Sequence, residues 1–191
     1  MRYSLVPYES APPQVRAIYD DYLSSTGSTA VPIWVQSLGS NPPLLHAYWE
    51  RTRGSLLVGD LPLLLKEMVV FVVSVENGSR YCSAAHAHSV LSMDSTLDYD
   101  RLLSLTTPGD NSAGLPSSYR AALDYAIKVA RDANTITDAD FEDLLDEDFT
   151  DEEIHELQSV IDLAMMFNSY TSARRLPLDA EYRSILEPIV A

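Results

Sequence analysis

The stretch from Leu61 to Val75 constrains the fold more than any other part of this sequence, because it is mostly apolar and ends at the turn signal Asn77-Gly78. Its second half is rich in valine, so the pattern would also suit a buried strand that enters a turn. Fifteen mostly apolar residues, however, exceed the usual length of a strand. The stretch is therefore predicted to be a largely buried helix whose apolar run is broken by Lys66 and Glu67.

Apolar periodicity and capping residues predict helices along the rest of the chain. The segment from Ser79 to about Ser92 is predicted to be a second helix, antiparallel to the first across a short turn. Further helices are predicted at 12–24, 34–38, from Asn41-Pro42-Pro43 onward, at 117–131, and from Thr150 through Phe167. Residues 98–105 look like a looser connection. Nothing demands a strand, so the prediction is an all-α fold: one domain over 1–191, in which two helical halves, about 1–95 and 96–191, could pack together.

Charge and hydrophobicity narrow the classes of partner. The chain has 13 basic and 28 acidic residues and a net charge of −15, which would repel nucleic acid and anionic lipid. The first seven residues contain no apolar run, and the stretch from Leu61 to Val75 is short for a bilayer span. We therefore expect a cytoplasmic protein with no nucleic-acid or membrane partner.

The sequence around its one cysteine is the best candidate for a chemical site. If Gly78 ends one helix and Ser79 begins the next, Cys82 lies in the first helical turn, where free backbone N–H groups and the helix dipole favour a thiolate. His86 follows at i+4, on the same helix face as the cysteine. Glu67 and His86 lie at similar distances from the turn, so they should be neighbours. Cys82, His86 and Glu67 are therefore predicted to form a proton relay.

Each of these residues also has a purely structural interpretation. A lone cysteine is often a small buried apolar residue, and His86 could be an ordinary packed or surface histidine. Lys66 and Glu67 could form only the exposed side of a helix. The simplest role for Ser79 is to cap the helix, its hydroxyl accepting a hydrogen bond from the backbone N–H of Cys82.

Metal binding is not predicted from the histidines. His86 and His88 lie two residues apart, so on a helix they point to different sides and cannot easily hold one ion. No Gly-rich phosphate loop and no Gly-x-Ser-x-Gly motif is present, and no cofactor is expected. With one cysteine, an internal disulfide cannot form, so any redox chemistry must borrow a second thiol from another molecule or subunit.

Taken together, these residues resemble the alkylhydroperoxidase D-like and carboxymuconolactone decarboxylase superfamily, particularly its peroxidase-related branch. The signature of that superfamily is a Glu, eleven residues, and then Cys-x-x-Cys-x-x-x-His. Glu67, Ser79, Cys82 and His86 match it in register, with serine in place of the first cysteine. Weaker similarities along nearly the whole chain agree, among them Asn41-Pro42-Pro43-Leu44-Leu45 and the segment around Phe167-Asn168.

The resemblance implies an alkylhydroperoxidase D-like helical bundle that assembles into homo-oligomers. It also implies that Cys82 attacks a small-molecule hydroperoxide while His86 and Glu67 relay the proton. Because Ser79 cannot form a disulfide, an external thiol would have to reduce the oxidised Cys82. Tyr81 could donate a hydrogen bond to the substrate, with Ser79 beside it, or could simply pack in the helix interface.

Two other functions stay open at this point. The same scaffold could carry an acid–base enzyme such as a decarboxylase, lyase or isomerase, with His86 and Glu67 as proton carriers and Cys82 auxiliary. It could also be a catalytically silent, oligomeric binding protein.

Overall fold

The computed structural model describes residues 4–183, so the first three residues of the N-terminal segment considered above lie outside it. Within that range the chain is helical and contains no strand, which confirms the predicted all-α fold. The α-helices are α1 (Pro13–Thr26), α2 (Ile33–Leu38), α3 (Pro42–Thr52), α4 (Leu63–Glu76), α5 (Arg80–Met93), α6 (Tyr99–Ser104), α7 (Ser117–Asp132), α8 (Asp138–Asp146) and α9 (Asp151–Arg174). Shorter turns of helix are η1 (Tyr8–Ser10), η2 (Arg53–Leu57), η3 (Ala133–Thr135) and η4 (Ala180–Tyr182).

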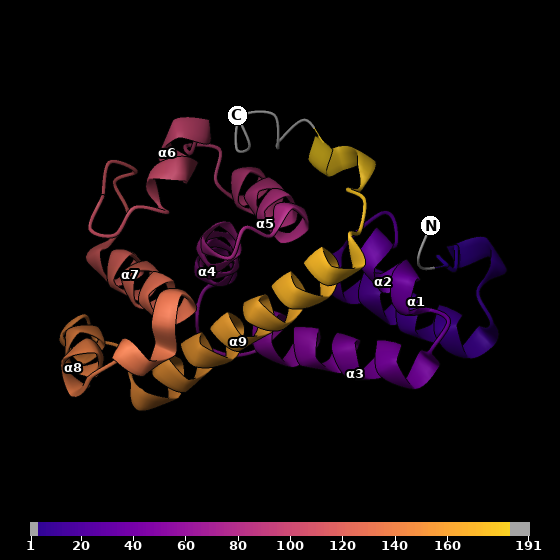
Figure 1. Ribbon diagram of the computed structural model, residues 1–191, viewed down its shortest axis with the longest axis horizontal. Helices are drawn as coiled ribbons and strands as arrows, with labels where there is room; N and C mark the ends of the chain where they lie inside the picture. Colours follow the sequence, from indigo (N-terminus) through magenta and orange to yellow (C-terminus); the bar gives the residue numbers. More distant parts are fainter. Residues whose placement is uncertain (1–3, 184–191) are drawn as a thin grey trace.

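Helix α4 lies at the centre of the structure, with other helices around it (Figure 1). Residues 65–74 are all buried, so this apolar stretch is the buried helix that the sequence predicted. Helix α5 returns antiparallel to it after Gly78, which adopts φ +64°. That backbone conformation costs glycine little. The tight reversal sets the start of α5 against the end of α4.

Helix α9 crosses α4 diagonally and is joined to it by polar contacts near both ends (Figure 1). Near the start of α4, the ammonium group of Lys66 pairs with Glu156 and also donates to the Val58 carbonyl at 2.7 Å. Near its end, Ser74 Oγ donates to Asn168 Oδ1 at 2.9 Å. Buried polar groups must find partners of this kind. The contacts therefore fix how α9 lies on α4.

The N-terminal helices form a second, smaller core beside α4 and α9. Helices α1, α2 and α3 pack around buried Val15, Tyr19 and Leu45. Tyr170 of α9 joins this core, and its hydroxyl lies 2.8 Å from Ser37 Oγ. After α9 the chain turns back towards α5 and α2 and forms η4 (Figure 1).

Two structural expectations from the sequence are corrected. Lys66 and Glu67 are not an exposed helix side, because only 2% and 6% of their surface is exposed. Part of the loose connection at 98–105 is helix α6, whose first turn is capped by Asp98 Oδ1 accepting from the Arg101 N–H at 2.9 Å. Among residues 4–183, no helix is both long and apolar enough to cross a bilayer.

We predict that Lys66→Met destabilises the protein, because it leaves the partly buried carboxylate of Glu156 without its cation. Breaking a fully buried pair costs about 3–5 kcal/mol, and the partial exposure of Glu156 places the expected loss below that range but above about 1 kcal/mol. The matched control is Lys128→Met, which removes the more exposed Lys128–Asp140 pair and should cost less than about 1 kcal/mol. Urea unfolding measures both, and equal losses of stability would contradict the role assigned to Lys66.

Candidate active site

The structure brings Glu67 and His86 into contact, as the sequence predicted. Glu67 lies on α4 and His86 on α5, and the His86 Nδ1 is 2.6 Å from Glu67 Oε2. Because a carboxylate only accepts hydrogen bonds, Nδ1 carries the hydrogen and donates it. In a neutral imidazole the other nitrogen, Nε2, is then unprotonated. The pair therefore leaves His86 able to accept a proton at Nε2.

Cys82 lies in the first turn of α5, as predicted, but the prediction of a resting thiolate is not supported. Only 3% of its surface is exposed. Burial raises the pKa of the Cys82 thiol, and hydrogen bonds with Thr171 and Ser79 oppose that effect only in part. The start of a helix favours an anion, but here the loss of water around the sulfur is the larger effect. The resting group is therefore a thiol.

Two buried hydroxyl groups lie next to the sulfur. Thr171 Oγ1 lies 3.4 Å from Cys82 Sγ and 3.3 Å from Ser79 Oγ, and it donates its hydrogen to the Phe167 carbonyl at 2.8 Å. In the resting state Thr171 therefore accepts a hydrogen from Cys82, a weak donor. Once the sulfur is anionic, both hydroxyls can turn and donate to it, and hydrogen bonds to an ion are stronger. The hydroxyl pair thus offsets part of the effect of burial on the pKa of Cys82.

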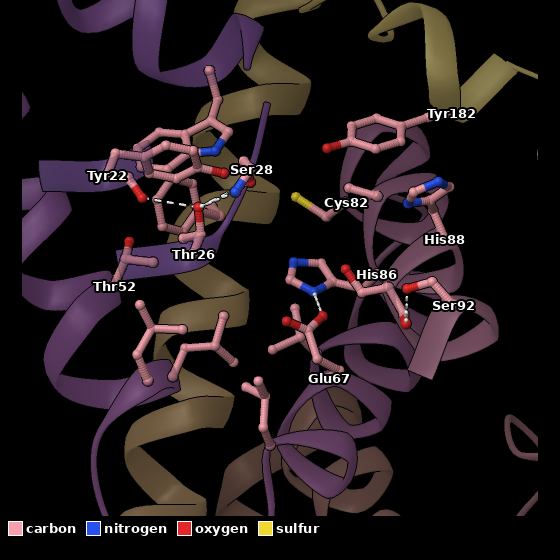
Figure 2. Close-up of a pocket in the computed structure, with 18 of the residues that line it drawn as sticks. Tyr22, Thr26, Ser28, Thr52, Glu67, Cys82, His86, His88, Ser92 and Tyr182 are labelled. Atoms are coloured by element: carbon pink, nitrogen blue, oxygen red, sulfur yellow. Dashed lines mark hydrogen bonds and ion pairs between the residues drawn. The ribbon is translucent and has the colours of Figure 1, made fainter. Parts of the chain in front are cut away.

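Cys82, His86 and Glu67 all line one cavity of about 500 Å³. Figure 2 shows the sulfur and the imidazole ring pointing into it, with Glu67 behind the ring and Tyr182 on the far side of the sulfur. The opposite wall comes from the end of α1 and the loop after it, including Tyr22, Thr26 and Ser28. Apolar side chains fill much of the rest, namely Leu56, Leu57, Leu63, Val70, Leu163 and Phe167. A small organic molecule would fit beside the sulfur.

The structure places Ser79 and Tyr81, the two predicted substrate-binding residues, in different surroundings. Ser79 is fully buried, is not part of the cavity wall, and does not form the predicted cap, because its hydroxyl is directed to Thr171. Tyr81 lines the cavity, but its hydroxyl donates to Asp179 Oδ2 at 2.5 Å. Burial raises the pKa of Tyr81 well above its usual range, as does the nearby Asp179.

Several residues of the site were not found by sequence reasoning. Thr171 touches the sulfur but lies 89 positions away from it. Asp179, besides binding Tyr81, accepts a hydrogen bond from the Ile33 N–H at 3.0 Å, and so ties the chain after α9 to the start of α2. Tyr182 packs edge-on against Tyr81 at 6.1 Å. Within residues 4–183, no group of three His, Cys, Asp or Glu side chains is arranged to hold a metal ion.

Comparisons with solved structures identify the fold. An uncharacterized peroxidase-related protein with an alkylhydroperoxidase AhpD core, from Ralstonia eutropha JMP134, is 23% identical with a TM-score of 0.81, over 95% of this chain and 93% of that one. A peroxidase-related protein from Silicibacter sp. TM1040 is 27% identical, with a TM-score of 0.80 over 93% and 91% of the two chains. The debrominase Bmp8, solved in complex with 2,3,4-tribromopyrrole, is 19% identical, with a TM-score of 0.77. The similarity covers 93% of this chain and 91% of the debrominase chain.

The chain thus has the alkylhydroperoxidase D-like fold. No protein-family model matches the sequence, and a comparison with curated proteins gave no match. The resemblance to the peroxidase-related branch of the superfamily, predicted from the spacing of Glu67, Ser79, Cys82 and His86, is confirmed through these structural neighbours.

We predict that Thr171→Val raises the pKa of the Cys82 thiol, because valine keeps the shape of threonine but cannot donate to the sulfur anion. Thr171→Ser, which keeps the hydroxyl, is the matched control and should leave the pKa nearly unchanged. The pH dependence of alkylation by iodoacetamide measures the pKa, and with one cysteine in the chain the signal reports Cys82 alone. At neutral pH, Thr171→Val should react roughly 5-fold more slowly, as expected for the loss of about 1 kcal/mol of hydrogen bonding.

Proposed function

We propose that this protein is a thiol-dependent hydroperoxide reductase that uses one reactive cysteine. The observation that carries the proposal is that Cys82 and His86 face one cavity while Glu67 holds the imidazole by its Nδ1 at 2.6 Å. A neutral thiol needs a base next to it in order to react quickly. His86 Nε2 provides that base, and Glu67 is the positioning residue that orients it.

The first step consumes the hydroperoxide. As Cys82 Sγ attacks the terminal oxygen of ROOH, its proton passes to His86 Nε2 and the O–O bond breaks. The departing alkoxide takes the proton back from His86 and leaves as an alcohol. The sum is Cys82–SH + ROOH → Cys82–SOH + ROH, in which the sulfur is oxidised and the peroxide is reduced. Thr171 and Ser79 stabilise the anionic sulfur during attack.

The second step needs a partner thiol, because Ser79 stands where a second cysteine would be required for an internal disulfide. An external thiol R′SH attacks the sulfenic acid and releases water, giving Cys82–S–SR′. A second external thiol then releases Cys82–SH and the disulfide R′S–SR′. The external thiol reductant and assembly into a homo-oligomer are both part of this proposal.

We expect Cys82→Ser to abolish the reduction of tert-butyl hydroperoxide in the presence of dithiothreitol. His86→Ala should lower kcat/KM by about 10²–10⁴-fold, the usual contribution of a positioned base. Glu67→Gln should have a smaller effect, since the amide can still accept the hydrogen bond from Nδ1. Peroxide consumption measures turnover, and trapping with dimedone followed by mass spectrometry shows whether Cys82 becomes a sulfenic acid. Full activity in Cys82→Ser would exclude the mechanism.

A second candidate is an acid–base enzyme in which His86 and Glu67 carry protons and Cys82 is auxiliary. It is favoured by the burial of the sulfur, which raises the thiol pKa while leaving His86 aligned. The presence of this fold in a debrominase also shows that the scaffold is not restricted to peroxidases.

The same two variants distinguish the candidates once turnover of any substrate is found. Acid–base chemistry predicts that Cys82→Ser keeps most of the activity while His86→Ala loses it. Peroxide reduction predicts that both variants lose it. A silent binding protein predicts no turnover in the wild-type protein or in any variant.

A further inference from the structure

The cavity beside Cys82 has no permanently cationic side chain among the described residues that line it. Among the described residues that line it there is no lysine and no arginine, whereas Glu67 and Glu181 both contribute carboxylates. Lys66, the residue before Glu67, does not line the cavity. Its ammonium group instead pairs with Glu156 and donates to the Val58 carbonyl. The chain as a whole carries a net charge of −15. An anion that entered the cavity would therefore lose its hydration without gaining a cationic partner.

The two histidines of the cavity do not change this balance. His86 is paired with Glu67 at 2.6 Å, so even a protonated His86 forms a pair of zero net charge. His88 lies against the ring of Tyr182, with the ring centroids 5.5 Å apart. Glu181, next to that tyrosine, is exposed and lies at the rim of the cavity. The electrostatic environment of the cavity thus disfavours a carboxylate or phosphate on the ligand.

Aromatic rings contribute to more than one side of the cavity wall. Tyr22 meets Trp34 edge-on at 6.0 Å, and Trp34 meets Phe167 edge-on at 4.8 Å. Tyr182 lies on the other side of the sulfur (Figure 2). Rings held in this way can present faces and edges to an aromatic ligand. Contacts between aromatic rings contribute more binding free energy than the buried area alone would give.

We propose that the substrate of this site is an uncharged organic hydroperoxide that carries an aromatic ring, and that the cavity rejects hydroperoxides of the same shape that carry a carboxylate. The ring packs among Tyr22, Trp34 and Phe167, and the peroxide group reaches Cys82 and His86. The inference rests on the proposed function for the peroxide group, whereas the selection for an uncharged aromatic body follows from the cavity wall alone.

The binding test uses unreactive product alcohols and the wild-type protein. Calorimetry near neutral pH compares cumyl alcohol with its para-carboxylate and with its cyclohexyl analogue. Cumyl alcohol should bind at least about tenfold more tightly than the carboxylate, the equivalent of one desolvated polar group left unpaired, and roughly threefold more tightly than the cyclohexyl compound. Equal binding of the carboxylate, equal binding of the saturated ring, or no binding of cumyl alcohol would each overturn the proposal.

A charge reversal at the rim tests whether the cavity itself makes the selection. Glu181→Lys should tighten binding of the para-carboxylate by roughly tenfold and leave cumyl alcohol unchanged, and Glu181→Gln should give a smaller gain. The matched control is Glu142→Lys, which makes the same change in net charge at an exposed position of α8 away from the cavity. If Glu142→Lys tightened binding of the para-carboxylate equally, the net charge of the protein, and not the cavity, would be what disfavours the carboxylate.

Turnover separates the failure of this inference from the failure of the proposed function. With dithiothreitol as reductant, kcat/KM for cumene hydroperoxide should exceed that for its para-carboxylate by about the same tenfold. If both hydroperoxides are reduced equally, the inference is wrong and the peroxidase proposal stands. If neither is reduced while the alcohols bind as expected, the peroxidase proposal is wrong and the selection for an uncharged aromatic ligand stands.

Discussion

Two adjacent charged residues inside helix α4 determine how the rest of the structure is arranged. Lys66 and Glu67 are both buried, and a buried charge without a partner is too costly to keep. Successive residues on a helix point in directions about 100° apart, so the two side chains reach different neighbours. Lys66 pairs with Glu156 of α9, and Glu67 pairs with His86 of α5. Satisfying both at once fixes the rotation of α4, and with it the position of the imidazole.

Helix α9 connects this framework to the sulfur. Asn168 binds Ser74 of α4 and, one turn later, Thr171 reaches Cys82 of α5. The same packing that supports the site therefore also buries the thiol and raises its pKa. A sulfur in such surroundings is protected from random oxidation, but it reacts only if a base and hydrogen-bond donors act when the negative charge forms. Under the proposed mechanism, His86 is the base, and Ser79 and Thr171 are the donors.

The sequence contained enough information to predict the fold and three residues of the site, Glu67, Cys82 and His86. Helix periodicity places Cys82 and His86 on one face, and similar distances from the turn at Gly78 place Glu67 near His86. Both inferences depend only on regular helix geometry, which the spacing encodes. Thr171 and Asp179 could not be found in this way, because their contacts arise from the way α9 and the chain after it pack against distant helices. The thiolate prediction failed for the same reason: the helix start is visible in the sequence, but the burial by α9 is not.

The position of Ser79 limits how a reaction at Cys82 can be completed. In the structure Ser79 is fully buried, is not among the residues that line the cavity, and its hydroxyl is engaged with Thr171. A group placed there can polarise the sulfur but can neither touch the substrate nor form a bond to an oxidised cysteine. Under the proposed mechanism, the peroxide and the external thiol must therefore reach Cys82 through the cavity that the sulfur lines, one after the other. The thiol then meets the same lining as the substrate, so the absence of lysine and arginine from the described lining residues affects both halves of the cycle. A reductant without a carboxylate near its sulfur fits this lining better than an acidic one.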